Sequence, residues 1–150
     1  MSKVQWLSTG RFAVPFSGGG LLGLPNNAFI GSSGIDGSSG DLSILSEVQL
    51  DVTFNTPPTS NTGFSVWFLR QTDGGTQFEF NYGSGGYWTP ARMPDVVLPL
   101  MSSILQQTVV VPCIIPPGNW KVWCRNDGTG QTTATSGCNM FIRPLTYNIN

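Results

Sequence analysis

The sequence contains no histidine and few charged residues. The lack of histidine excludes imidazole bases, catalytic triads with histidine and histidine-ligated metal sites. Seven Lys and Arg residues and eight Asp and Glu residues give a charged fraction of 10%, against about 25% in an average soluble domain. The basic residues are scattered singly along the chain, so no basic patch forms from sequence neighbours. We therefore expect no nucleic-acid partner.

Long apolar runs and complete ligand-binding motifs are also missing. No run approaches the roughly 20 residues of a membrane-spanning helix, so we expect no membrane partner. The N-terminus lacks the apolar stretch of a signal peptide, which predicts synthesis in the cytoplasm without export. The glycine-rich loops are not followed by lysine and a helix, and no calcium loop is complete. These absences predict that the chain binds no cofactor and no metal.

The three cysteines and the eight carboxylates do not form a catalytic pattern. Cys113, Cys124 and Cys138 contain no Cys-x-x-Cys pair, and we interpret them as buried thiols. One disulfide with one free thiol, or a three-thiolate metal site, are the alternatives. Glu47 and Asp51 are spaced to share one face of a strand, and we interpret such carboxylates as solvated strand positions rather than an acid/base pair. The chain is therefore predicted not to be an enzyme.

The pattern of apolar residues predicts an all-β fold. Nineteen glycines and eleven prolines interrupt any long helix. Apolar and polar residues alternate over residues 48–54, 77–82 and 120–125, and residues 64–70 and 105–115 are rich in apolar and β-branched side chains. Residues 93–100 contain two prolines that favour an edge strand or an irregular segment. We predict an antiparallel, jelly-roll-like β-sandwich over residues 42–150.

Residues 1–41 are predicted to form an extended Gly/Ser-rich N-terminal arm. Such a segment becomes ordered by lying either on its own domain or on a neighbouring subunit. Its apolar and aromatic residues, with one arginine, are our candidates for a capsid or subunit interface. They are Trp6, Arg11, Phe12, Phe16, Leu21, Leu22 and Phe29.

A second candidate site is an aromatic loop formed by Tyr82, Tyr87 and Trp88, with Arg92 close by. Aromatic rings on a glycine-rich loop stack on sugars or anchor protein interfaces, and an arginine adds a planar hydrogen-bonding fork. The loop is also able to fold back over a sheet edge. The sequence leaves these three alternatives open.

Several motifs from residue 64 onward resemble those of small virion structural proteins of tailed bacteriophages. They are Val66-Trp-Phe-Leu-Arg70, Asp73-Gly-Gly75, Phe78-Glu79, the segment 90–100, Pro117-Gly-Asn-Trp-Lys-Val122, Asn126-Asp-Gly-Thr-Gly-Gln131, Asn139, Arg143-Pro144 and Tyr147. The resemblance implies a capsid decoration (cement) protein with a jelly-roll-like body, often a homotrimer. Its partner would be the major capsid protein, and its location the outer surface of the virion. The alternative is a carbohydrate- or receptor-binding β-sandwich domain of a phage tail or fibre, with the aromatic loop as its glycan site.

Overall fold

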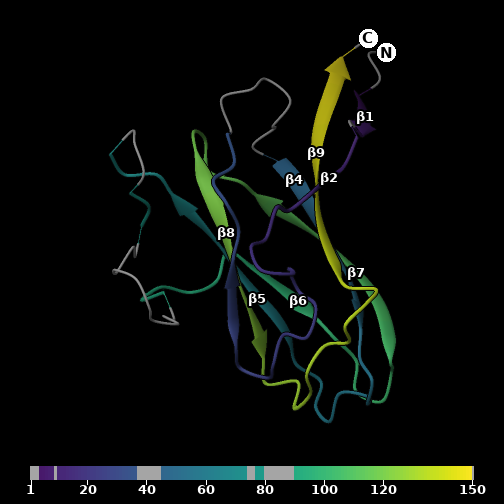
Figure 1. Ribbon diagram of the computed structural model, residues 1–150. Coiled ribbons are helices and arrows are strands. Elements are labelled where there is room, and N and C mark those ends of the chain that lie inside the picture. The colour runs from purple at the N-terminus through teal and green to yellow at the C-terminus, as the bar shows by residue number, and fades with distance from the viewer. Residues whose placement is uncertain (1–3, 9, 37–44, 74–76, 80–89, 150) are drawn as a thin grey trace.

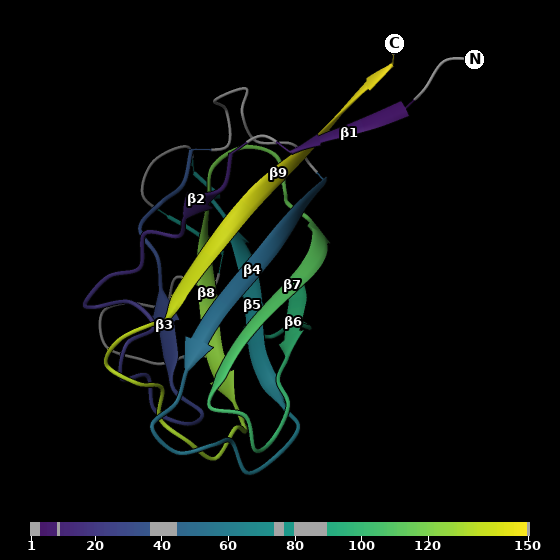
Figure 2. The ribbon, with the colours of Figure 1, turned by 90° about the vertical axis from the view of Figure 1, so that its right-hand side faces the viewer.

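The computed structural model describes residues 4–8, 10–36, 45–73, 77–79 and 90–149. These residues form two antiparallel sheets that pack face to face, and they contain no helix (Figures 1 and 2). The predicted all-β sandwich is thereby confirmed. Within the described part of the chain, no helix is long and apolar enough to cross a membrane.

Each sheet combines strands that are far apart in the sequence. The five-stranded sheet has the order β1 (Val4–Ser8), β9 (Asn139–Ile149), β4 (Leu45–Thr53) and β7 (Gln106–Ile114), and β2 (Phe12–Ala13) also pairs with β9. The four-stranded sheet has the order β3 (Phe29–Gly31), β8 (Trp120–Asp127), β5 (Gly63–Arg70) and β6 (Val96–Pro99). Strands β6 and β7 are therefore edge strands of the two sheets, and they contact one another.

The core lies between the sheets and follows from the period of two along the strands. Val48, Leu50 and Val52 of β4 point inward and are fully buried. Burial of each such side chain contributes about 1.5–3 kcal/mol. Strand β5 differs, because it is buried on both faces. Its Trp67 and Leu69 pack with Phe29 of β3 in a second apolar cluster outside the main core.

Residues 10–36, expected to belong to an arm, lie on the chain's own sandwich. Val14, Leu21 and Leu24 are buried in the main core, and strands β2 and β3 each extend one of the sheets. This agrees with the first of the two alternatives for the segment. A boundary near residue 42 does not separate residues 10–36 from the body, because their leucines fill the same core as β4. Residues 37–44 lie outside the described residues.

Two further local predictions, on the edge strand β6 and on the cysteines, are confirmed among the described residues. Strand β6 is an edge strand, as its prolines predict. All three cysteines are buried and free, as we interpreted them. Half of the alternating segment 77–82, residues 80–82, lies outside the described residues. Within it, Phe78 forms an isolated bridge with Gln71.

Candidate interaction surface

Exposed apolar side chains are concentrated on and next to the two edge strands β6 and β7. Among the described residues, eight large apolar side chains are strongly exposed, and seven of them belong to residues 93–114. We call this group the β6–β7 edge surface. Its members are Met93, Val97, Met101, Ile104, Leu105, Val110 and Ile114.

The two edge strands explain why these side chains reach solvent. In β7, Gln107 and Cys113 are buried, whereas the outward Val110 and Ile114 are 47% and 70% exposed. In β6, the outward Val97 is 53% exposed. The solvated face of an antiparallel sheet is usually polar. Outward aliphatic residues on both edges are therefore typical of a surface that another molecule covers.

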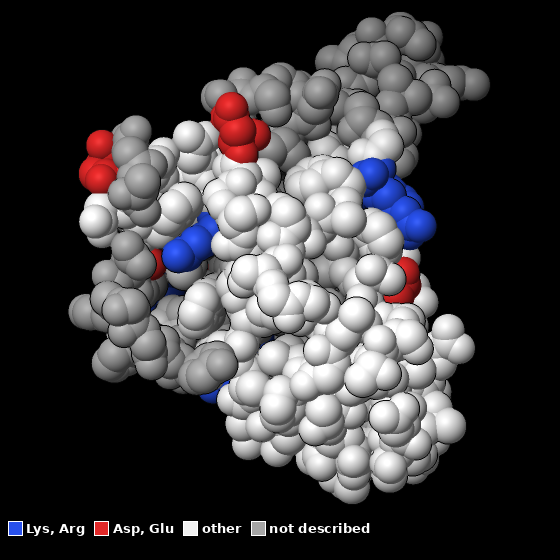
Figure 3. Space-filling model, viewed as in Figure 1, with Lys and Arg blue, Asp and Glu red and all other residues white. Residues whose placement is uncertain are grey.

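The β6–β7 edge surface is also free of charge over most of its length. Residues 96–120 contain no charged residue. In the face shown by Figure 3, the lower right part has no charged side chain. The seven side chains together expose on the order of 600 Å² of apolar area, spread over both edge strands and the segments next to them. Such a surface suits a contact that depends on shape and apolar area.

The loop between β6 and β7 is held in place by one buried side chain. The amide group of Gln107 donates hydrogen bonds to the carbonyl oxygens of Met101 and Ile104, at 2.9 and 3.1 Å. Its side-chain oxygen accepts from the Met101 N–H at 2.8 Å. In addition, the Ser102 N–H donates to Asn61 Oδ1 at 2.7 Å. The exposed residues of this loop are thus preorganised, which lowers the entropy lost on binding.

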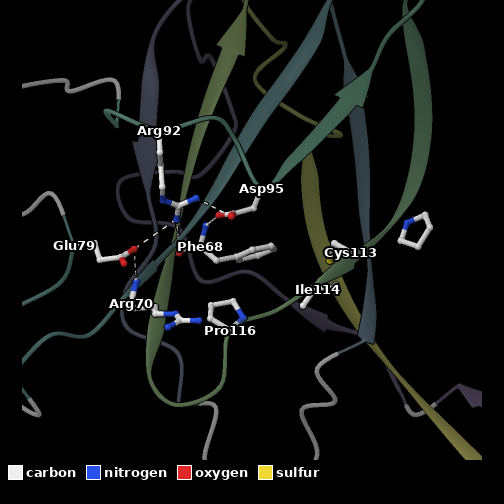
Figure 4. Close-up of a pocket in the computed structure, with 9 residues that line it drawn as sticks. Phe68, Arg70, Glu79, Arg92, Asp95, Cys113, Ile114 and Pro116 are labelled. Atoms are coloured by element: carbon white, nitrogen blue, oxygen red, sulfur yellow. Dashed lines mark hydrogen bonds and ion pairs between the residues drawn. The ribbon is translucent and has the colours of Figure 1, made fainter.

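A pocket of about 620 Å³ adjoins this surface between β5 and β7, beyond the end of β6 (Figure 4). Its walls combine apolar residues, including Phe68 and Ile114, with two arginines and two carboxylates. The charged side chains bind the backbone of β5 where β6 no longer does. The Phe68 N–H donates to Asp95 Oδ2 at 2.7 Å, and Arg92 donates to the Phe68 carbonyl oxygen at 2.9 Å.

The carboxylates in this pocket serve the strand edge and Arg92. Arg92 forms ion pairs with Asp95 at 2.7 Å and with Glu79 at 3.5 Å. Glu79 also accepts from the Arg70 N–H, and its own N–H donates to the Arg70 carbonyl oxygen. Together these contacts hold the segments before β6 against β5. They give Glu79 and Asp95 a structural task rather than an acid/base arrangement.

The cysteine beside this pocket is a buried thiol. Burial raises the pKa of Cys113 to about 12, and the negative charges of Asp95 and Glu47 add to the effect. Because the thiolate is the reactive form, the thiol is inert near neutral pH. Within the described part of the chain, no three potential metal ligands are grouped together.

The arm residues predicted as an interface differ in how deeply they are buried. Leu21 and Phe29 are 1% and 8% exposed and pack inside the chain, so they are not contact residues, and the prediction is corrected for these two. Phe12 and Phe16 are partly buried against the core. Leu22 is 41% exposed.

Arg11 and Trp6 lie with the five-stranded sheet. The Arg11 guanidinium stands 4.1 Å from the centre of the Phe141 ring and donates to Gln49 Oε1 at 3.1 Å. Trp6 belongs to β1, at the register position opposite Tyr147. Arg11 therefore lies across the outer face of the sheet. On that face, Gln49 lies between Glu47 and Asp51 of β4, the two residues that the sequence predicted to share a face.

The polar residues of that outer face pair with their neighbours. Glu47 forms an ion pair with Arg143, and Asp51 accepts hydrogen bonds from Gln49 and Thr108. These contacts agree with the interpretation of Glu47 and Asp51 as strand-face carboxylates.

The predicted aromatic loop lies outside the described residues for Tyr82, Tyr87 and Trp88. Its fourth member, Arg92, is engaged by Phe68, Glu79 and Asp95, as described above.

Sequence reasoning missed the β6–β7 edge surface. The signal for it was the absence of charge over residues 96–120, combined with apolar residues at alternate positions of a proline-containing segment.

Comparison of the chain with protein-family models, with curated proteins and with solved structures finds no match.

Proposed function

We propose that this chain is a non-enzymatic structural protein of a phage virion, which binds the outer capsid surface at subunit junctions and stabilises the shell. The observation that supports this most is the β6–β7 edge surface, which is uncharged, apolar and mounted on a rigid sandwich. The sequence resemblance to virion structural proteins supports the same function. The proposal includes a jelly-roll-like connectivity for the body of the chain. It also includes a location of the protein on the virion surface.

The stabilising mechanism is mass action. A protein that binds the assembled shell but not its dissociated subunits shifts the equilibrium toward the shell. The β6–β7 edge surface spans the edges of both sheets and one connecting loop, so it presents apolar groups in more than one direction. Such a shape suits a junction, where two coat subunits meet.

The first test of this function is the copy number of the chain in purified particles of the virus that encodes it. Quantitative mass spectrometry compares its abundance with that of the major capsid protein. A ratio near that of the capsid protein supports shell decoration. A handful of copies, or none, contradicts it and favours the tail or fibre alternative, which a glycan-binding panel then examines.

The second test places one charge on the proposed contact. Ile114→Asp changes a side chain that is 70% exposed, so the fold should be retained. Burying an unpaired carboxylate in an apolar contact should weaken binding to particles that lack the protein by tenfold or more. Thr135→Asp, at an exposed position of the β8–β9 loop, is the matched control and should bind like the wild type. Equal binding of both variants would show that the β6–β7 edge surface does not bind the shell.

A further inference from the structure

The two ends of the described chain form a ribbon that extends beyond the sandwich. The pairing of β9 with β4 ends at Pro144, opposite Ser46. After that point residues 145–149 of β9 pair with β1. Figures 1 and 2 show both strands projecting together from the body. We call residues 4–8 and 145–149 the terminal ribbon.

The apolar pattern of β9 changes phase where the strand leaves the body. Within the sandwich the even-numbered residues Met140, Ile142 and Pro144 are buried. Beyond Pro144 the even-numbered positions are the polar Thr146 and Asn148. The apolar residues there occupy odd-numbered positions, which are 145, 147 and 149. Because successive residues of a strand alternate between faces, the apolar positions of the ribbon lie on the face opposite to that of the core.

Strand β1 has its apolar positions on the same face. Directly opposite residues of an antiparallel pair share a face, and the register sets Val4 opposite Ile149 and Trp6 opposite Tyr147. Ser8 stands opposite Leu145. One face of the ribbon thus holds five apolar residues in six positions. The other face holds three polar residues and Leu7.

The terminal ribbon needs a partner on its apolar face. A two-stranded ribbon is marginally stable in water, and stability requires further strands or a second layer on its apolar face. The described strand that continues beside residues 145–149 is β1 itself, and the phase change turns the apolar positions away from the chain's own core side.

We propose that a second copy of this chain covers the apolar face, so that ribbons from different copies pack against each other. Both strands of the ribbon are uncharged. A symmetric contact brings identical residues together across its axis, and an uncharged face meets its copy without like-charge repulsion. Two ribbons face to face supply the second layer that each one lacks. This self-association is independent of the proposed binding to a shell.

The size of the face indicates how strong the contact is. Five apolar positions per copy are few beside the roughly 20–30 residues that each partner contributes to a standard interface. We therefore expect a self-association that depends on concentration, in the micromolar range, rather than a permanent complex.

Sedimentation velocity of the purified full-length chain, from about 1 to 100 μM, tests the proposal across the micromolar Kd expected for a contact of this size. The double variant Trp6→Glu with Tyr147→Glu places two charges on the apolar face and should sediment as a monomer throughout. The control Gln5→Glu with Asn148→Asp adds the same charge to the same strands on the other face. It should associate like the wild type.

The folded state of each variant is checked by the midpoint of urea unfolding. The core residues of the body lie between Val14 and Ile142, so ribbon variants should unfold with the cooperative transition of the wild-type monomer. Should the double variant unfold, Val4→Glu at the far end of the ribbon replaces it.

Three results would overturn the proposal. They are a wild-type chain that is monomeric at every concentration, an apolar-face variant that associates like the wild type, and a control that dissociates as completely as the apolar-face variant. A monomeric wild type whose apolar-face variant loses binding to coat particles would assign the face to the coat protein instead. Loss of self-association with unchanged particle binding supports the ribbon contact whatever the shell experiments show.

Discussion

Substitution of Thr133 by valine tests whether residues 10–36 belong to the folded body. The Thr133 hydroxyl accepts a hydrogen bond from the Leu24 N–H at 2.7 Å and donates one to the Leu21 carbonyl oxygen. The residue is 1% exposed, so water cannot replace either partner. Valine has nearly the same shape and removes only the hydroxyl group. The change therefore isolates the part of the hydroxyl group in the link between the glycine-rich segment and the β8–β9 loop, because the backbone hydrogen bonds of Gly23 with Ala134 and of Thr133 with Leu24 remain.

The expected loss of stability follows from the two backbone groups that lose their partner. A buried N–H or carbonyl group left without a hydrogen bond costs about 1–3 kcal/mol. Two such groups predict a decrease of roughly 2–6 kcal/mol in the free energy of unfolding. This is a large part of the total of about 5–15 kcal/mol for a typical domain.

Urea unfolding, followed by tryptophan fluorescence, measures the change against Thr135→Val. Thr135 is exposed in the same loop and should change the free energy of unfolding by less than about 0.5 kcal/mol. A Thr133→Val protein as stable as this control would refute the argument. It would mean that the Thr133 hydroxyl does not contribute to holding Leu21 and Leu24 in the core.

Three further predictions concern a carboxylate, the thiols and a glycine. Burial disfavours the charge of Asp127, yet hydrogen bonds from Arg125 and Ser65, with the charge of Arg125, hold its pKa below the usual value. Its contribution to stability is therefore present above the unfolded pKa and lost as pH falls through the folded pKa. Asp127→Asn should therefore reduce the fall of the urea midpoint on acidification below the usual carboxyl pKa of 3.8. Burial raises the pKa of Cys113 to about 12, and all three thiols are buried. Iodoacetamide at about pH 8 should therefore label none of them before the chain unfolds. Rapid labelling of the native chain, detected by mass spectrometry, would contradict this. A Cβ added to Gly63 would overlap the Leu98 carbonyl oxygen, so Gly63→Ala should lower the free energy of unfolding by about 2 kcal/mol or more. A Cβ at Gly10 meets no atom, so the control Gly10→Ala should leave the free energy of unfolding nearly unchanged in the same urea titration.

The strands with clear alternation were predictable because their pattern is local. Val48, Leu50 and Val52 repeat at the period of a half-buried strand, and β4 contains all three. The partners of β4 were not predictable. It pairs with β7 and β9, whose sequences lie far downstream, and no local feature of β4 selects these two strands over the others.

The burial of the glycine-rich segment was not predictable for a similar reason. Leu21 and Leu24 show no strand period, and glycines between them suggested little area to bury. Their place in the core depends on Thr133 and Asn126, which bind their backbone from more than a hundred residues away. The β6–β7 edge surface was missed because a strand's outward face is exposed or covered according to the strand's position in the sheet, which long-range pairing decides.

The charged side chains bound to β5 affect how copies of this chain meet. Asp95, Arg92 and Glu79 occupy backbone groups at Phe68 and Arg70 that a neighbouring strand would otherwise use. A side chain, unlike a strand, has no second row of backbone groups to offer to the next molecule. This edge therefore terminates hydrogen-bonded growth, which is the route by which exposed edges lead to fibrous aggregates. At high local concentration, copies of the chain are left to meet this stretch of β5 through side-chain contacts rather than by adding a strand to it.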